Sequence, residues 1–141
     1  MTRTAQHLLF HGMLLFLLGL LGGVVVQYLH NPRMGLAAHL AGVQNGLALL
    51  AFGLVWQYTD PPLLQVTYWT SLFGLYGIWL ALLLAAIWGT SRSTPIAGAG
   101  FTGAPWQEMA VTLLLTSASV AIIVATGLML LGLFTKLNSR Q

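Results

Sequence analysis

The stretch AAHLAGVQNGLALLAFG, residues 37–53, reads as most of a membrane span, yet it carries polar groups and a row of glycines. The polar groups are His39, Gln44 and Asn45. A helix needs about 20 apolar residues to cross a hydrocarbon core of about 30 Å. Polar side chains are costly at that depth unless they find partners. The stretch therefore predicts a transmembrane helix whose polar face has a specific purpose.

The composition of the whole chain supports a membrane protein. The 141 residues are 57% hydrophobic and only 5% charged, whereas a soluble domain carries about 25% charged residues. The five basic and two acidic residues all fall outside the long apolar runs. No basic cluster points to nucleic acid. The absence of cysteine excludes disulfides, zinc–thiolate sites and iron–sulfur clusters within this chain.

Four apolar runs are long enough to span, at residues 8–28, 36–58, 63–88 and 109–134. We therefore predict an all-α integral membrane protein, with residues 1–141 forming a single four-helix transmembrane domain. The first run is longer than the apolar core of a signal peptide, so we expect a span there. Pro32 and the Asp60-Pro61-Pro62 sequence separate the first three spans, because proline disfavours helix in the residue before it.

The third connection, TSRSTPIAGAGFTGAPW at residues 90–106, is the longest. Its glycine, proline, serine and threonine content predicts irregular backbone. A connection of this length is either a flexible linker or a lid over a site, and the sequence leaves both open.

An even number of spans places both termini on one side of the membrane. Arg3, Lys136 and Arg140 lie on that side, and Arg33 and Arg92 on the other. This excess of positive charge favours cytoplasmic N- and C-termini. We expect the location to be a bacterial inner membrane.

One face of the second span combines a histidine with glycines. His39, Gly42, Gly46 and Gly53 recur at i, i+3, i+7 and i+14, which places them on one side of a helix. Two readings stay open for the glycines: close helix packing, or room beside the imidazole for a flat macrocycle. His39 is likewise either a packing residue or a metal ligand, since an ionisable group within a span is a functional candidate.

Asn45 lies six residues after His39, about 120° further around the helix. It either flanks the same cavity or makes an interhelical hydrogen bond. Gln44 points away from the face of His39 and Gly42, and packing is the role expected for it.

Candidate pocket residues also occur in the first and third spans. His11 is a second candidate ligand or a pocket wall. Tyr76 and Trp79 share a face at i, i+3 and either face lipid or line an aromatic substrate pocket. Tyr68 and Trp69 fit the interfacial aromatic belt.

Several functions are disfavoured by what the spans lack. They contain no carboxylate for a proton-relay pump, no nucleotide-binding loop and no inverted repeat of the kind that transporters show. Chemistry here needs a bound cofactor, and a haem held by histidine suits a cysteine-free chain.

Three stretches carry a family resemblance: HGMLLFLLGLLGG (11–23), NPRMGLAAHLAGVQNG (31–46) and WGTSRSTPIAGAG (88–100). Their order on a four-span layout resembles the hydroxylaminobenzene mutases, a small family of integral-membrane isomerases. A more distant similarity connects the chain to styrene oxide isomerase. The shared motifs are His11-Gly12 and a His-x5-Asn-Gly sequence that starts at His39 and ends at Asn45-Gly46.

The resemblance implies a homotrimer of four-helix subunits with haem b at the subunit interfaces. It makes His39 the axial ligand of the haem iron, which would place Gly42 and Gly46 beside the cofactor. Asn45 would orient the substrate.

The related isomerase also uses a pocket tyrosine in its third helix. The simplest register puts Trp79 at that place, with Tyr76 one turn away. We therefore expect Tyr76 to assist Asn45 in holding the substrate, and His11 and Trp79 to line the pocket.

The reaction implied by the resemblance converts hydroxylaminobenzene to 2-aminophenol, a step of nitroaromatic degradation, with ferric haem as a Lewis acid at the N–OH group. The partners would be a small aromatic hydroxylamine and the lipid bilayer, with no nucleic acid. The alternative is a non-enzymatic haem-binding membrane anchor or electron-transfer subunit, in which His11 would be a second axial ligand.

Overall fold

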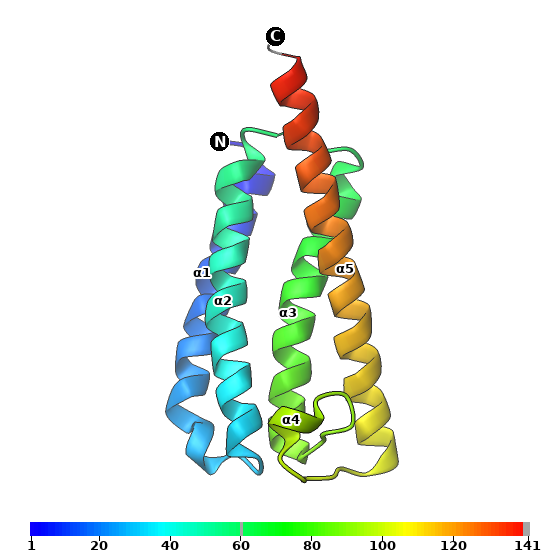
Figure 1. The fold of residues 1–141 in the computed structure, drawn as a ribbon. Coiled ribbons are helices and arrows are strands. Elements are labelled where there is room, and N and C mark those ends of the chain that lie inside the picture. The colour runs from blue at the N-terminus through cyan, green and yellow to red at the C-terminus, as the bar shows by residue number, and fades with distance from the viewer. Residues whose placement is uncertain (60, 140–141) are drawn as a thin grey trace.

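Figure 1 shows the computed structural model, which describes residues 1–59 and 61–139. Its elements in chain order are α1 Arg3–Val25, the short 3-10 turn η1 Val26–Tyr28, α2 Pro32–Trp56, α3 Leu64–Trp88, α4 Pro95–Gly98 and α5 Pro105–Asn138. The described residues contain no strand, so the predicted all-α class is confirmed. Asp60 and Arg140, which the sequence assigned to a helix break and to the charged C-terminal end, lie outside the described residues.

Four helices, α1, α2, α3 and α5, are each long and apolar enough to cross a membrane. The first two begin before their apolar runs because polar side chains cap them. Thr2 Oγ1 accepts a hydrogen bond from the Ala5 N–H at 3.3 Å. Asn31 Oδ1 accepts one from the Met34 N–H at 3.2 Å, and Pro32 occupies the first turn of α2, where its missing N–H costs nothing.

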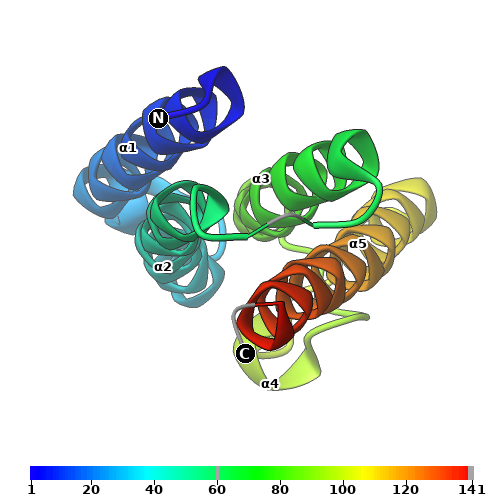
Figure 2. The same cartoon turned by 90° about the horizontal axis from the view of Figure 1, so that it is seen from above.

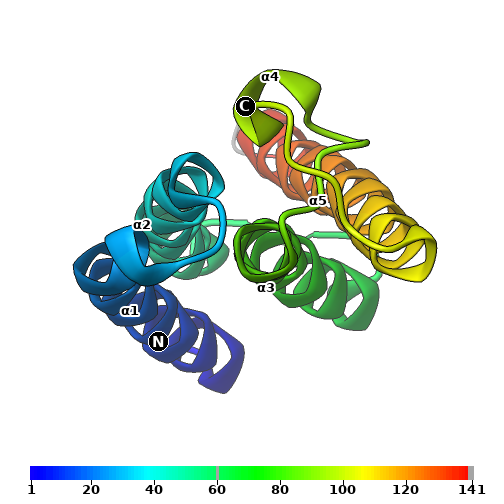
Figure 3. The same cartoon turned by 90° about the horizontal axis from the view of Figure 1, so that it is seen from below.

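The long helices form two antiparallel hairpins, α1 with α2 and α3 with α5 (Figure 2). The hairpins meet along α2 and α3, while α1 and α5 lie on the outside, as the opposite view also shows (Figure 3). The bundle predicted from sequence is therefore an open one. The start of α1 and the end of α5 lie at the same end of the molecule (Figure 1). Which side of a membrane that end faces stays a prediction.

Glycines let α1 and α2 approach until their backbones touch. A Cβ atom added at Gly19 would lie 2.5 Å from the backbone nitrogen of Val43, and one at Gly42 would lie 2.5 Å from the Gly19 Cα. A Cβ at Gly46 would lie 2.5 Å from the Phe16 nitrogen. Gly42 and Gly46 therefore act as the small-xxx-small pair that permits close helix packing.

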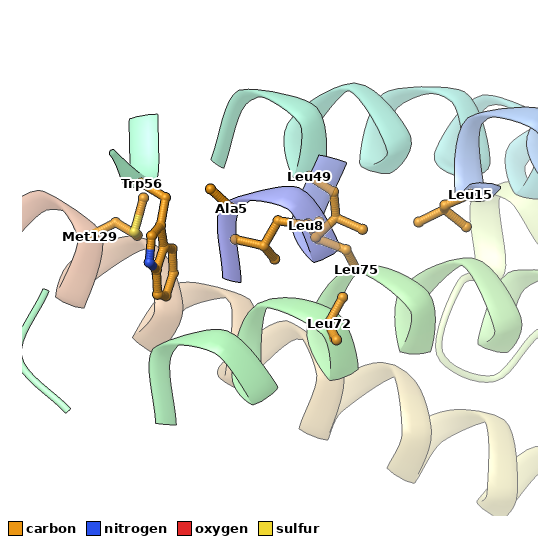
Figure 4. Packing of buried hydrophobic residues seen from close by; sticks show 8 residues of the cluster. All are labelled: Ala5, Leu8, Leu15, Leu49, Trp56, Leu72, Leu75 and Met129. Atoms are coloured by element: carbon orange, nitrogen blue, oxygen red, sulfur yellow. The ribbon is translucent and has the colours of Figure 1, made fainter. Parts of the chain in front are cut away.

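A buried apolar cluster joins the two hairpins. Leu8 and Leu49 fill the space between α1 and α2, and Leu75 extends the cluster onto α3 (Figure 4). Trp56, near the end of α2, lies beside Met129 of α5. This cluster provides much of the apolar packing between the two hairpins.

Asn31 connects the start of α2 to the loop after α3. It is completely buried, and its side-chain Nδ2 donates to the carbonyl of Gly98 in α4 at 3.0 Å, while its Oδ1 caps α2. Its own N–H donates to the carbonyl of Ala86 at 2.9 Å. One residue, through its side chain and its backbone N–H, thus fixes α4 against α2 and α3.

A single carboxylate organises the rest of the 90–106 loop. Glu108 lies in the first turn of α5 and is 9% exposed. It accepts backbone hydrogen bonds from the N–H groups of Ser91 at 3.1 Å, Arg92 at 2.9 Å and Gly103 at 3.0 Å. Both ends of the loop are therefore anchored on one side chain, and the loop is an ordered cap rather than a flexible linker.

We expect Glu108→Gln to lower the free energy of unfolding by about 1.5–3 kcal/mol, because hydrogen bonds to a charged group are replaced and buried N–H groups lose their acceptor. Thermal unfolding in detergent measures the change. Arg92→Gln is the matched control, since it removes the neighbouring charge but keeps the backbone N–H. An equal loss in both variants would show that ion pairing, and not the backbone bonds, holds the loop.

Candidate functional site

The structure places His39 against α1. Its Nδ1 lies 2.7 Å from the carbonyl oxygen of Gly19, so the ring donates a proton there. The imidazole also lies over Gly23, where an added Cβ would come within 2.7 Å of Nδ1. This bond fixes the tautomer and leaves Nε2 as the basic nitrogen, half-buried and free of hydrogen bonds within the described residues.

A histidine in this state is fit to ligate a metal. Metal-binding histidines commonly donate their second ring N–H to a backbone carbonyl, which orients the ring and raises its basicity. The described residues contain no cluster of three or more histidine, aspartate or glutamate side chains. A haem needs only one or two protein ligands, so one imidazole would suffice to hold it.

Of the two readings of the glycine face of α2, the structure shows close helix packing at Gly42 and Gly46. Backbone of α1 occupies the surface at Gly42 and Gly46, and the indole of Trp79 comes within 2.9 Å of a Cβ placed at Gly42. A flat group cannot enter there without separating the helices. An added Cβ at Gly22 of α1, by contrast, would meet nothing within 4 Å. Contact of Gly42 or Gly46 with a cofactor stays a prediction.

Asn45 makes the interhelical hydrogen bond that was one of its two readings. Its Nδ2 donates to the carbonyl of Leu75 in α3 at 2.8 Å. The side chain is half-buried and its Oδ1 remains available as an acceptor. Asn45 thereby holds α3 at the residue next to Tyr76, and its contact with a substrate stays a prediction. Gln44 is exposed and does not join this group.

His11 and Tyr76 form a reciprocal pair between α1 and α3. The Tyr76 hydroxyl donates to the carbonyl of His11 at 3.1 Å, so its oxygen accepts from His11 Nδ1 at 3.3 Å. The two rings meet edge to face, with centroids 5.8 Å apart. Because Nδ1 carries the proton, His11 Nε2 is left as a base.

An apolar groove of about 440 Å³ adjoins this pair. Its walls come from α1 and α3 and are largely aromatic, and the lining residues are His11, Leu14, Trp69, Leu72, Phe73 and Tyr76. A groove of this size and character suits a small aromatic molecule with one polar group. Trp79 is not among the lining residues, because it packs at Gly42 instead.

The groove also contains Trp69 and Phe73, which the sequence does not predict there. The sequence favours the interfacial aromatic belt for Trp69. The signal was present, since Trp69, Phe73 and Tyr76 recur at i, i+4 and i+7 on one face of α3. From sequence alone, an aromatic residue of the interfacial belt cannot be distinguished from one that lines a pocket, because the difference depends on where the neighbouring helix lies.

His39 contacts α1 about two helical turns away from His11. His39 bonds the carbonyl of Gly19, which is eight residues and about 12 Å of helix from His11 at the α-helical rise. Both axial ligands of a haem must touch the same iron. The structure gives His11 a bond to Tyr76, and a role for it as a second axial ligand stays a prediction.

Comparisons with known proteins give this arrangement a context. The family model for styrene oxide isomerase matches residues 4–134. Hydroxylaminobenzene mutase HabA of Ectopseudomonas oleovorans is 42% identical over 125 residues, covering 86% of this chain and 93% of the relative. Hydroxylaminobenzene mutase HabB of the same organism is 42% identical over 132 residues, covering 92% of this chain and 80% of the relative. No solved structure matches the chain. With a family model matched over nearly its full length, the chain belongs to the styrene oxide isomerase family.

Proposed function

We propose that this chain is a membrane isomerase that converts hydroxylaminobenzene to 2-aminophenol. The relatives named as hydroxylaminobenzene mutases, each 42% identical over most of the chain, support the reaction class. The reaction is an intramolecular transfer: the N–O bond breaks, a bond forms between oxygen and the ortho carbon, and the proton of that carbon ends on nitrogen. No atom or electron is gained or lost.

The observation that carries the proposal is the hydrogen-bonded His11–Tyr76 pair at the wall of an aromatic groove. The groove provides apolar walls for a phenyl ring. The pair provides a hydroxyl and a basic nitrogen, which are the groups that the two proton transfers of the rearrangement need.

In our proposal His39 Nε2 holds a ferric haem b, and the working protein is a homotrimer with haem at its subunit interfaces. When bound, the haem supplies a Lewis acid that polarises the N–O bond of the substrate.

The chain's own residues carry the remaining work. The Tyr76 oxygen, at the groove wall, accepts a hydrogen bond from the N–OH group, and Asn45 keeps Tyr76 in place through its bond to the Leu75 carbonyl. His11 Nε2 takes the proton from the ortho carbon after oxygen has arrived there, which restores the aromatic ring. Trp69 and Phe73 exclude bulk water, which would otherwise capture the electrophilic ring and scatter the products.

The proposal is tested by adding hydroxylaminobenzene to the detergent-purified protein and separating the products. We expect 2-aminophenol alone, together with a Soret band that shifts on addition of substrate. A six-coordinate low-spin haem that ignores substrate, without turnover, would instead favour an electron-transfer subunit. Turnover without any Soret band would support the mutase activity and contradict the proposed haem.

We expect His39→Gln to lose the Soret band and most of the activity. Glutamine can still donate to the Gly19 carbonyl, so the helix contact survives while the ligand nitrogen is lost. The measurement is the ratio of haem to protein beside the rate of 2-aminophenol formation. His7→Gln, an exposed position at the start of α1, is the control. Full activity with retained haem in His39→Gln would refute the ligand assignment.

A further inference from the structure

A second cavity, of about 600 Å³, lies at the opposite end of the molecule from the termini. It opens between the first turns of α2 and the short helix α4. Arg33, Ser93 and Thr94 supply its polar part, and Leu36, Leu40 and Ile96 are prominent in its apolar part. None of these residues lines the groove beside His11.

The charge of Arg33 is not neutralised within the described residues. Glu108 is the one carboxylate described, and the loop N–H groups of Ser91, Arg92 and Gly103 occupy its oxygens. Arg33 is exposed and its guanidinium has no partner in that part of the chain. An uncompensated guanidinium beside a cavity favours an anionic ligand, and phosphate suits its planar donor set.

The apolar part of the cavity extends along the membrane-spanning helix. Leu36 and Leu40 follow Arg33 at i+3 and i+7, so they continue its face of α2 toward the membrane interior. Ile96 is 88% exposed, the most of any large apolar residue described. A ligand that satisfies both parts has an anionic head at the membrane surface and a hydrocarbon chain below it.

The wall formed by α4 is held in place before any ligand arrives. Asn31 bonds the Gly98 carbonyl at 3.0 Å, and an added Cβ at Gly98 would clash with the Cβ of Ser91. The Ser93 hydroxyl is 2.6 Å from that of Thr112 in α5. A fixed wall lowers the ordering cost of binding.

We propose that this cavity binds one anionic phospholipid, with its phosphate on Arg33 and an acyl chain along Leu36, Leu40 and Ile96. Free phosphate would use Arg33 but none of the apolar wall. The neutral aromatic hydroxylamine would use the wall but not the charge. The lipid is the occupant that uses both.

The test uses the full chain in detergent, with phosphatidylglycerol, phosphatidylcholine and inorganic phosphate as separate probes. Native mass spectrometry counts bound lipid, and thermal unfolding reports the stabilisation that binding confers. We expect one phosphatidylglycerol per chain and a raised Tm, a smaller response to phosphatidylcholine, and none to inorganic phosphate.

Arg33→Gln should weaken phosphatidylglycerol binding about fivefold, the effect of one basic group near a membrane surface. Arg92→Gln, an exposed arginine of the same end that does not line the cavity, should leave binding unchanged. Ile96→Ser keeps the charge and should also weaken binding. Equal losses for both arginine variants would overturn the site in favour of general surface attraction. A Tm shift reproduced by inorganic phosphate, or an unaffected Ile96→Ser, would overturn the lipid.

Discussion

His11→Gln should lower the turnover of hydroxylaminobenzene by about 100-fold, the lower limit for loss of a positioned general base. Glutamine can still donate a hydrogen bond to the Tyr76 oxygen, so the contact between α1 and α3 survives. What disappears is the basic Nε2 nitrogen. The loss should fall on kcat rather than KM, because the base acts after the substrate has bound.

The isotope effect makes this expectation specific. With substrate deuterated at both ortho carbons, His11→Gln should show a larger primary isotope effect than the wild type, because proton removal becomes rate-limiting. Haem content should stay at the wild-type level, which separates this variant from His39→Gln. Tyr76→Phe should move kcat in the same direction. An unchanged kcat in His11→Gln would show that the groove is not the site of the reaction, and it would leave the assignment as a mutase unaffected.

Gly42→Leu should cost about 3 kcal/mol or more of unfolding free energy, at the upper end of what overpacking costs. Even its Cβ would lie 2.5 Å from the Gly19 Cα and 2.9 Å from the Trp79 indole. Backbone cannot rotate away as a side-chain end can, so α1 and α2 must separate. Since His39 is oriented by Gly19, the variant should also lose the haem that we propose His39 holds.

Unfolding in detergent, followed by helical circular dichroism, measures this loss. Gly127→Leu is the matched control, because an added Cβ at this exposed position of α5 meets nothing within 4 Å. It should leave stability unchanged or raise it slightly through helix propensity. Similar destabilisation of both variants would mean that glycine matters to these helices for a reason other than close approach.

The sequence predicted the spans well because hydropathy is a local property of 20 or so consecutive residues. It also singled out His39, Asn45, His11 and Tyr76, since polar groups within apolar runs are visible without any fold. What it could not decide was which partner each of them meets. Asn45 bonds a carbonyl thirty residues away on another helix, and no periodicity in α2 contains that information.

The glycine face illustrates the limit most clearly. Gly42 and Gly46 on one side of a helix fit a cavity and a tight helix contact equally well. In the structure the backbone of α1 at Gly19 and Phe16 lies against these two glycines, so they form a tight helix contact. The loop was ambiguous for a similar reason: its composition indicates irregular backbone, and only the placement of Glu108 beneath it explains why that backbone is ordered.

The groove beside His11 has one further consequence. Its rim residues Leu14, Phe73 and Trp69 are 36%, 48% and 62% exposed, and the first two lie in the middle of their helices. At that depth the surroundings are hydrocarbon, so the groove opens sideways into the lipid. Its occupancy is then governed by how a molecule distributes between water and bilayer. An apolar compound at low aqueous concentration accumulates in the bilayer, so its concentration beside the groove is high. Adding more lipid lowers that concentration and should lower the occupancy of the groove.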